Sequence, residues 1–387
     1  MLIAHVILAI AAVGALVLAP RSAAGAALVV AAAAVDVALG TAPSHALQVV
    51  APLLAFLGAA LTLAALVERS GLAERAAFAL AAGARESAIA LYLLVCALCV
   101  MLTAAISLDG AVVLIVPLLV VLAKRFDAPF APLFLGAVVV ANAASIAVPQ
   151  GNPTNLVVID RLGLSPAAFA AHMLGPGLLA AALCAAGVAL SERQALTAAV
   201  GHGERKRTPF SAAERHAAAA LCVAALAAWA APFLGVAPWW PFTGAVSLAL
   251  LAARERPHVI VPWRVGAQVG GLVIVIQALA LPTPGTPALG LVGLLAVAAF
   301  VGAASALANN LPVSVWAASL LAVPAPAYAA SIGLAVGSLA TPQGSVATLI
   351  AAQLAGDDAP PLRVRRFAPL ATAALVAATL MLWLKAP

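Results

Sequence analysis

Long apolar runs recur along the whole of this 387-residue chain, and they constrain its fold more than any other feature. An α-helix needs about 20 apolar residues to cross the hydrocarbon core of a bilayer. Ten continuous runs occupy residues 2–18, 23–39, 46–67, 89–106, 167–190, 217–236, 242–253, 269–281, 288–308 and 367–384, and three broken runs occupy 111–123, 131–158 and 311–350. The chain therefore has room for roughly 10–12 membrane segments.

The composition supports the same conclusion. Charged residues make up 8% of the chain and hydrophobic residues 65%, whereas a soluble protein carries roughly 25% charged residues. A soluble globular enzyme is therefore excluded, and we predict an all-α polytopic membrane protein. The apolar run 2–18 lacks a basic start, so we interpret it as the first membrane helix and not as a cleaved signal.

The basic residues lie mainly in the polar segments between the apolar runs. The longest of these segments, residues 191–216, contains Arg193, Arg205, Lys206, Arg207 and Arg215. Lys and Arg are enriched in the cytoplasmic loops of membrane proteins, so we expect this segment to be a cytoplasmic linker. The net charge of +6 is then a topology signal, and we expect no nucleic-acid partner.

A short motif occurs once in each half of the chain. Residues 144–157 read ASIAVPQGNPTNLV and residues 337–350 read GSLATPQGSVATLI. The shared core is Pro149-Gln150-Gly151 in the first copy and Pro342-Gln343-Gly344 in the second. Small polar residues follow the core in each copy, and the two copies stand about half a chain length apart.

A polar break in an apolar run precedes each motif, at Ser107-Leu108-Asp109 in the first half and at Asn309-Asn310 in the second. We therefore predict two transporter repeats, residues 1–190 and 217–387, on either side of the linker. An unwound turn leaves backbone N–H and C=O groups that hydrocarbon cannot satisfy. Interrupted helices at corresponding places in two halves consequently indicate the substrate site of a secondary transporter.

Amide and hydroxyl side chains gather around the two turns and the two breaks. These groups both donate and accept hydrogen bonds, and no Lys or Arg lies within the turns. The set suits a small oxygen-rich solute, neutral or weakly anionic, or a dehydrated Na⁺. We predict substrate-binding or ion-binding roles for Asp109, Asn142, Ser145, Gln150, Asn152, Thr154, Asn155, Asn309, Asn310, Thr341, Gln343, Ser345 and Thr348.

Asp109 is the most informative of these residues. Carboxylates inside membrane segments are costly and usually functional, and only Asp36 and Asp109 lie well inside apolar runs. Asp109 stands at a helix break, where it could bind a proton or a cation, or cap the half-helix that follows. For Asp36, an interfacial position is an equal alternative. His172 and the Cys96–Cys99 pair lie in apolar runs, where packing roles are favoured.

The motifs resemble those of the ion transporter superfamily, and within it those of the bacterial arsenite/antimonite efflux permeases (ArsB type). The resemblance rests on residues 107–111 with Pro117, on 141–142 and 151–157, on 309–312 and on 341–349. It implies two inverted-topology repeats, re-entrant hairpins, a substrate site between them and often a homodimer. The superfamily also includes sodium–dicarboxylate, citrate and sodium–proton transporters.

We therefore expect a secondary transporter in a bacterial inner membrane. The leading hypothesis is efflux of arsenite or a similar small oxyanion, coupled to proton entry through Asp109. One alternative is a sodium-coupled anion or dicarboxylate symporter, and another is the membrane subunit of a pump driven by a cytoplasmic ATPase. We predict no enzyme, because the sequence has no phosphate-binding GxxxxGK motif, zinc motif or Ser-His-Asp set. We expect no cofactor other than the coupling ion, a proton or Na⁺.

Overall fold

The computed structural model describes residues 2–18, 22–201, 209–253, 263–280, 290–320 and 323–385. Within these ranges the chain forms α-helices joined by short turns and 3₁₀ segments, with no β-strand. The helices are α1 (Leu2–Leu18), α2 (Ala23–Ala38), α3 (Ser44–Arg69), α4 (Leu72–Ala84), α5 (Ala88–Ala105), α6 (Leu108–Phe126), α7 (Phe130–Ala144), α8 (Pro153–Leu162), α9 (Pro166–Ser191), α10 (Ala212–Ala230), α11 (Trp239–Ala253), α12 (Trp263–Ala278), α13 (Leu291–Ala308), α14 (Asn310–Leu320), α15 (Pro324–Val336), α16 (Val346–Ala355) and α17 (Val364–Lys385).

Seven helical segments in the described ranges are long and apolar enough to cross a membrane. They are Ala46–Arg69, Ala88–Ala105, Phe130–Ala147, Pro166–Ser191, Ala212–Leu234, Leu291–Ala308 and Val364–Lys385. Four shorter apolar helices accompany them, α1, α2, α11 and α12. The prediction of an all-α, multi-pass membrane protein is confirmed.

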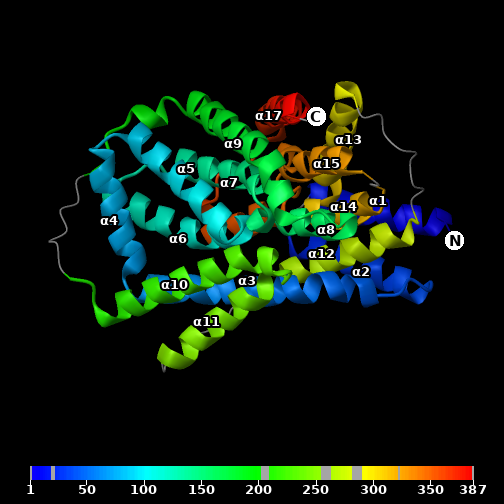
Figure 1. Cartoon of the computed structure of the whole chain (residues 1–387), viewed down its shortest axis with the longest axis horizontal. Helices are drawn as coiled ribbons and strands as arrows, with labels where there is room; N and C mark the ends of the chain where they lie inside the picture. The colour runs from blue at the N-terminus through cyan, green and yellow to red at the C-terminus, as the bar shows by residue number, and fades with distance from the viewer. Residues whose placement is uncertain are drawn as a thin grey trace.

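The helices form two layers, which we call the flanking layer and the central bundle. The flanking layer contains α1–α3 and α10–α12, and the central bundle contains α4–α9 and α13–α17. Figure 1 shows α3, α10 and α11 along one edge of the molecule and α9 and α17 along the opposite edge, with α6, α7 and α8 between them. The largest cluster of buried apolar side chains lies inside the central bundle, where it joins helices of both halves of the chain.

A second apolar cluster holds the two layers together. It contains Phe56 and Leu57 of α3 and Phe242 of α11, and it extends to Val113 of α6 and Val346 of α16. The rings of Phe56 and Phe242 lie 4.7 Å apart between their centroids. Helices α6 and α16, which follow the first break and the second turn, are consequently packed against the flanking layer near their starts.

The halves of the chain also pack crosswise. Helix α6, which follows the first break, packs against α16, which follows the second turn. Helix α14, which follows the second break, packs against α8, which follows the first turn. This crossing brings both predicted breaks and both predicted turns to the middle of the molecule.

Part of the predicted basic linker lies outside the described residues, namely residues 202–208, which include Arg205, Lys206 and Arg207. In the described part of the linker, Glu192 forms an ion pair with Arg366 of α17, with 2.5 Å between Oε1 and Nη2. The linker end that follows α9 is therefore attached to the central bundle.

Candidate functional site

Both polar breaks are true interruptions between helices. Helix α5 ends at Ala105, and Ser107 caps α6 by accepting a hydrogen bond from the Gly110 N–H over 3.1 Å. Helix α13 ends at Ala308, and Asn309 adopts a positive φ of 73° before α14 begins. The Asn309 side-chain oxygen accepts a hydrogen bond from the Leu311 N–H over 3.2 Å. A short polar side chain therefore satisfies a free N–H at the start of each new helix.

The two Pro-Gln-Gly turns have the same tight backbone contact. A Cβ atom on Gly151 would lie 2.3 Å from the carbonyl oxygen of Ser145, and a Cβ atom on Gly344 would lie 2.1 Å from that of Ser338. Real Cβ atoms do not approach an oxygen so closely, so each turn requires glycine at this position. The sequence repeat therefore corresponds to a repeated three-dimensional structure.

The two glutamines of the motif attach each turn to the broken helix of its own half. Gln150 donates from Nε2 to the Ala104 carbonyl of α5 over 2.6 Å, and Gln343 donates to the Ala306 carbonyl of α13 over 3.0 Å. Thr341 also donates to Ala306. Carbonyl groups in the last turn of a helix lack intrahelical partners, so these side chains supply what the interruption removes.

Several predicted site residues serve mainly to hold the backbone of the first turn. Asn155 donates from Nδ2 to the carbonyls of Ser145, over 2.8 Å, and Val148, over 3.0 Å. Asn152 donates to the Ser145 hydroxyl over 3.1 Å and caps α8 by accepting from the Thr154 N–H. Asn142 donates to the Val138 carbonyl within its own helix. These bonds replace the helical ladder in a segment without water-exposed backbone.

The second turn is held by the second break. Asn309 donates from Nδ2 to the Gln343 carbonyl over 2.8 Å, and the Asn310 N–H donates to the Gly344 carbonyl, also over 2.8 Å. The break and the turn of the second half consequently form one hydrogen-bonded unit.

A small cavity lies where the four interruptions meet. It measures about 10 Å³, and its lining includes Asp109, Asn152, Thr154 and Asn310 with the apolar residues Leu53, Leu108, Pro153, Leu311 and Val346. This volume suffices for one water-sized occupant. Each break and the first turn provide polar groups to it, and Val346 opens the helix after the second turn. We call it the Asp109 cavity.

Three buried oxygen atoms of this cavity lack a hydrogen-bond partner among the described residues: Asp109 Oδ1, Thr154 Oγ1 and Asn310 Oδ1. The three side chains are at most 2% exposed. A buried polar atom without a partner is costly, and hard cations such as Na⁺ take oxygen ligands. The free oxygens therefore fit a small cation held at Asp109.

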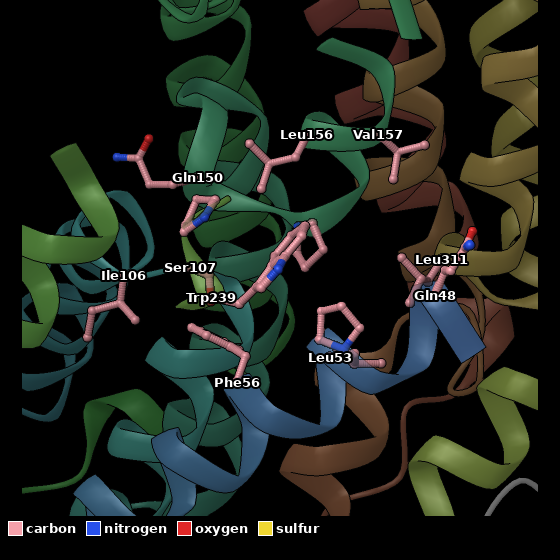
Figure 2. A pocket seen from close by; sticks show the side chains of 13 residues that line it. Gln48, Leu53, Phe56, Ile106, Ser107, Gln150, Leu156, Val157, Trp239 and Leu311 are labelled. Carbon is pink, nitrogen blue, oxygen red and sulfur yellow. The ribbon is translucent and has the colours of Figure 1, made fainter. Parts of the chain in front are cut away.

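A larger cavity adjoins the Asp109 cavity and shares the wall residues Leu53, Pro153 and Leu311 with it. It measures about 150 Å³ and lies between the flanking layer and the central bundle. Figure 2 shows Leu53 and Phe56 of α3 on one side, Leu156 and Val157 of α8 on the other, and Trp239 between them. We call it the apolar cavity.

The thirteen predicted site residues thus separate into three groups. Asp109, Asn152, Thr154 and Asn310 meet at the Asp109 cavity, and Gln150 lines the apolar cavity. Six further residues donate side-chain hydrogen bonds to backbone carbonyls: Asn142, Ser145, Asn155, Asn309, Thr341 and Gln343. Ser345 and Thr348 are buried at the start of α16, and the Ser345 hydroxyl has no partner among the described residues.

The sequence motifs did not indicate the residues that the flanking layer contributes, above all Leu53, Phe56 and Trp239. These are ordinary apolar residues at places where lipid-facing side chains are equally expected. The only available sequence signal was weak: Pro52 inside the apolar run of α3 and Pro238 just before α11 both line the apolar cavity.

The remaining residues singled out in the sequence do not join the site. Asp36 is fully buried and pairs with His5 of α1, with 2.6 Å between Oδ1 and Nδ1. His172 contacts the Ala168 carbonyl and stacks on Tyr328. Cys96 and Cys99 are buried in packing contacts. The described residues contain no cluster of three or more His, Cys, Asp or Glu side chains that could hold a metal ion.

The comparison with family models assigns the chain to a family. The model described as citrate transporter (CitMHS) matches residues 13–331, which include both breaks and the first turn. The chain belongs to the citrate transporter family. It is therefore a multi-pass membrane transporter, and the predicted superfamily is confirmed. A closer relation to arsenite permeases is not supported by this match. No curated protein matched the chain.

Proposed function

We propose that this protein is a secondary transporter that moves a small organic carboxylate across the membrane together with Na⁺ bound at the Asp109 cavity. The family supports the class of cargo, because its model is that of citrate transporters. The side chains of the Asp109 cavity support Na⁺ as the coupling ion. Sodium-coupled uptake of a carboxylate is therefore favoured over the proton-coupled efflux of arsenite that the sequence motifs first suggested.

The unpartnered oxygens of the cavity are the reason for proposing Na⁺ as the coupling ion. A proton on Asp109 would neutralise the carboxylate and supply one hydrogen-bond donor, but it would not bring the three oxygens around one centre. Asp109 Oδ1, Thr154 Oγ1 and Asn310 Oδ1 all lack partners in the part of the chain that the structure describes. One Na⁺ ion can accept all three oxygens as ligands at once, and the cavity volume of about 10 Å³ accommodates a single dehydrated ion.

The carboxylate would bind beside this cation. Helices α6, α8 and α14 all begin at the Asp109 cavity, where Leu108, Pro153 and Leu311 line the wall. The N-terminus of a helix carries free N–H groups and about half a positive charge. The combination of a bound cation and three helix N-termini favours an anion without any basic side chain.

The crosswise packing of α6 with α16 and of α8 with α14 supports two inverted repeats, residues 1–190 and 217–387, each of which contributes helices to both layers. In this proposal the segment 191–216 is the cytoplasmic linker between them, and the membrane is the bacterial inner membrane. The apolar contact between flanking layer and central bundle is the surface along which the layers move.

One observation favours the earlier arsenite hypothesis as a second candidate. None of the residues that line the two cavities is Lys, Arg or His. Arsenite is a neutral trihydroxide near neutral pH, and amides and hydroxyls could bind it without a fixed cation. The free oxygens around Asp109 are acceptors, however, and a neutral solute does not account for them as directly as a cation does.

The test measures uptake of labelled Na⁺ into proteoliposomes under an inward gradient of citrate, succinate or benzoate. At least one carboxylate is expected to stimulate Na⁺ uptake. Asp109→Asn should reduce the stimulation at least tenfold, because the anionic ligand is lost. Asp160→Asn is the matched control, since Asp160 is exposed on α8, and it should retain the stimulation.

Each other outcome contradicts the proposal. If no carboxylate stimulates Na⁺ uptake, the sodium-coupled mechanism is wrong. If labelled citrate instead enters under a pH gradient without Na⁺, the coupling ion is a proton. If only labelled arsenite moves under a pH gradient, the arsenite hypothesis is favoured. If flux requires an added ATPase, the chain is a pump subunit.

A further inference from the structure

The apolar cavity is unusual for a transporter of highly charged anions. None of its thirteen lining residues is ionisable, and ten are Leu, Ile, Val, Pro, Phe or Trp. Its polar residues are Gln48, Ser107 and Gln150. The cavity adjoins the Asp109 cavity, so a solute in it would lie next to the coupling ion. Its chemistry therefore bears on which carboxylate the protein carries.

The size of the cavity sets the size of the occupant. It measures about 150 Å³. An apolar protein cavity of about this volume takes one benzene molecule. Leu53 and Phe56 of α3 face Leu156 of α8 across this space. Together they offer an apolar environment for a single ring or a short branched chain.

The lack of charged side chains in the cavity walls limits how many carboxylate groups a bound solute can carry. Each ionised group that leaves water must recover its hydration through paired charges or hydrogen bonds. A tricarboxylate such as citrate would bring three charges against walls that hold no Lys, Arg or His. A monocarboxylate brings one negative charge, which the helix N-termini and the coupling ion can compensate.

Two donors are available for that one carboxylate. The indole Nε1 of Trp239 is buried and has no hydrogen-bond partner among the described residues, although its ring lines the cavity. A buried indole N–H normally finds an acceptor. The Ser107 hydroxyl accepts from the Gly110 N–H, which leaves its own proton for a further acceptor. Ser107 and Trp239 lie at the starts of α6 and α11, so the N-terminal dipole of α11 adds to that of α6 in favouring an anion there.

We propose that the preferred cargo is a monocarboxylate with an apolar body of about the size of a benzene ring. Its carboxylate accepts hydrogen bonds from Trp239 and Ser107, and its body lies against Leu53, Phe56 and Leu156. This inference rests on the proposed function, since it assumes that the cavity is the carboxylate site of a sodium-coupled transporter.

The test compares benzoate with citrate in the same labelled Na⁺ assay, in which leakage of benzoic acid through the bilayer carries no Na⁺. The half-saturating concentration of benzoate should be at least tenfold lower than that of citrate. Trp239→Phe keeps an aromatic ring and removes the N–H, so it should raise the half-saturating concentration of benzoate at least fivefold. Trp240→Phe is the control, because Trp240 is 56% exposed and does not line the cavity.

A gain-of-charge variant tests the same point without disturbing the core. Gln48 is exposed at the start of α3 and lines the cavity. Gln48→Arg adds a guanidinium that can pair with a second carboxylate, so it should lower the half-saturating concentration of citrate at least fivefold. Leu47→Arg adds the same charge to an exposed neighbour that does not line the cavity and should have no such effect.

The outcomes separate the two proposals. Citrate preferred over benzoate in the wild type would overturn this inference while leaving sodium-coupled carboxylate transport intact. Unchanged benzoate values in Trp239→Phe, with citrate unchanged in Gln48→Arg, would also overturn it. Failure of all carboxylates to stimulate Na⁺ uptake would overturn the proposed function itself.

Discussion

At the scale of single residues, the polar groups near the two turns do different work although they look alike in the sequence. Asn309 and Gln343 use their amide N–H groups to bind backbone carbonyls. Asp109 and Asn310 keep an oxygen without a partner in the described structure. The first kind maintains an interrupted helix in a place without water, and the second kind is available to an ion.

The glycines of the two turns should be the least replaceable residues of the motif. Gly151→Ala and Gly344→Ala would each place a Cβ within about 2.3 Å of a serine carbonyl, and overpacking of this kind costs about 1–3 kcal/mol or more. We expect a lower melting temperature for both in detergent. Gly58→Ala on α3 is the control, because nothing lies within 4 Å of its added Cβ. Equal melting temperatures for the three variants would contradict the tight turns.

The turn glutamines should be equivalent to each other and sensitive to loss of the amide. Gln150→Glu and Gln343→Glu remove the donor to a carbonyl of a broken helix, and an unpaired buried group costs about 1–3 kcal/mol. Thermal unfolding should show a clear loss of stability for both. Gln353→Glu, on the exposed side of α16, should be neutral. A loss in only one turn would mean that the repeat is not structurally equivalent.

At the scale of elements, one contact ties the first half of the chain to the start of α10. Arg75 of α4 donates from Nε and Nη2 to the two carboxylate oxygens of Glu214, over 2.8 and 3.0 Å. Glu214 also closes a capping box with Ser211 at the N-terminus of α10. The guanidinium lies 4.2 Å from the centre of the Phe210 ring. The end of the linker that leads into α10 is thus fixed to the central bundle.

This contact should depend on the planar fork of arginine and not on charge alone. Arg75→Lys keeps the charge but cannot form both hydrogen bonds, and Arg75→Met keeps only the stem. We expect both to lower the melting temperature, Met more than Lys. Arg85→Met, at an exposed position after α4, should have little effect. A lysine variant as stable as the wild type would show that the paired hydrogen bonds contribute nothing.

At the scale of the whole molecule, the two cavities lie where the central bundle meets the flanking layer. Leu53 belongs to both cavities, and it comes from α3 of the flanking layer. If the flanking layer slid along the central bundle, access to Asp109 and access to the apolar cavity would therefore open or close together.

Sodium and carboxylate should consequently stabilise the protein cooperatively. A ligand that binds only the native state adds about 1.4 kcal/mol of stability per tenfold rise in concentration above its Kd. Na⁺ should raise the melting temperature, and benzoate should raise it more in Na⁺ than in choline. Binding linkage is reciprocal, so benzoate must increase the effect of Na⁺ equally. Asp109→Asn should abolish the sodium effect, and strictly additive shifts would contradict coupled binding.

The sequence alone determined the membrane character, the two breaks and the two turns. These follow from local composition, because an apolar run must be helical in lipid and a Pro-Gln-Gly segment cannot remain a regular helix. The sequence showed Gly151 and Gly344 as part of the repeat, but the close carbonyl contacts that require glycine came from the structure. The sequence did not reveal which polar side chains lack a hydrogen-bond partner. That depends on whether a backbone carbonyl such as that of Ala104 or Ala306 lies within hydrogen-bond distance.

Only the tertiary structure decided which side chains line the two cavities. The walls of the apolar cavity come from α3, α8 and α11, which are far apart in the chain. Leu53, Phe56 and Trp239 are apolar residues like those that face lipid, and one chain segment cannot show whether an apolar side chain meets lipid or another helix. That distinction depends on long-range packing, which brings the flanking layer against the ends of the broken helices.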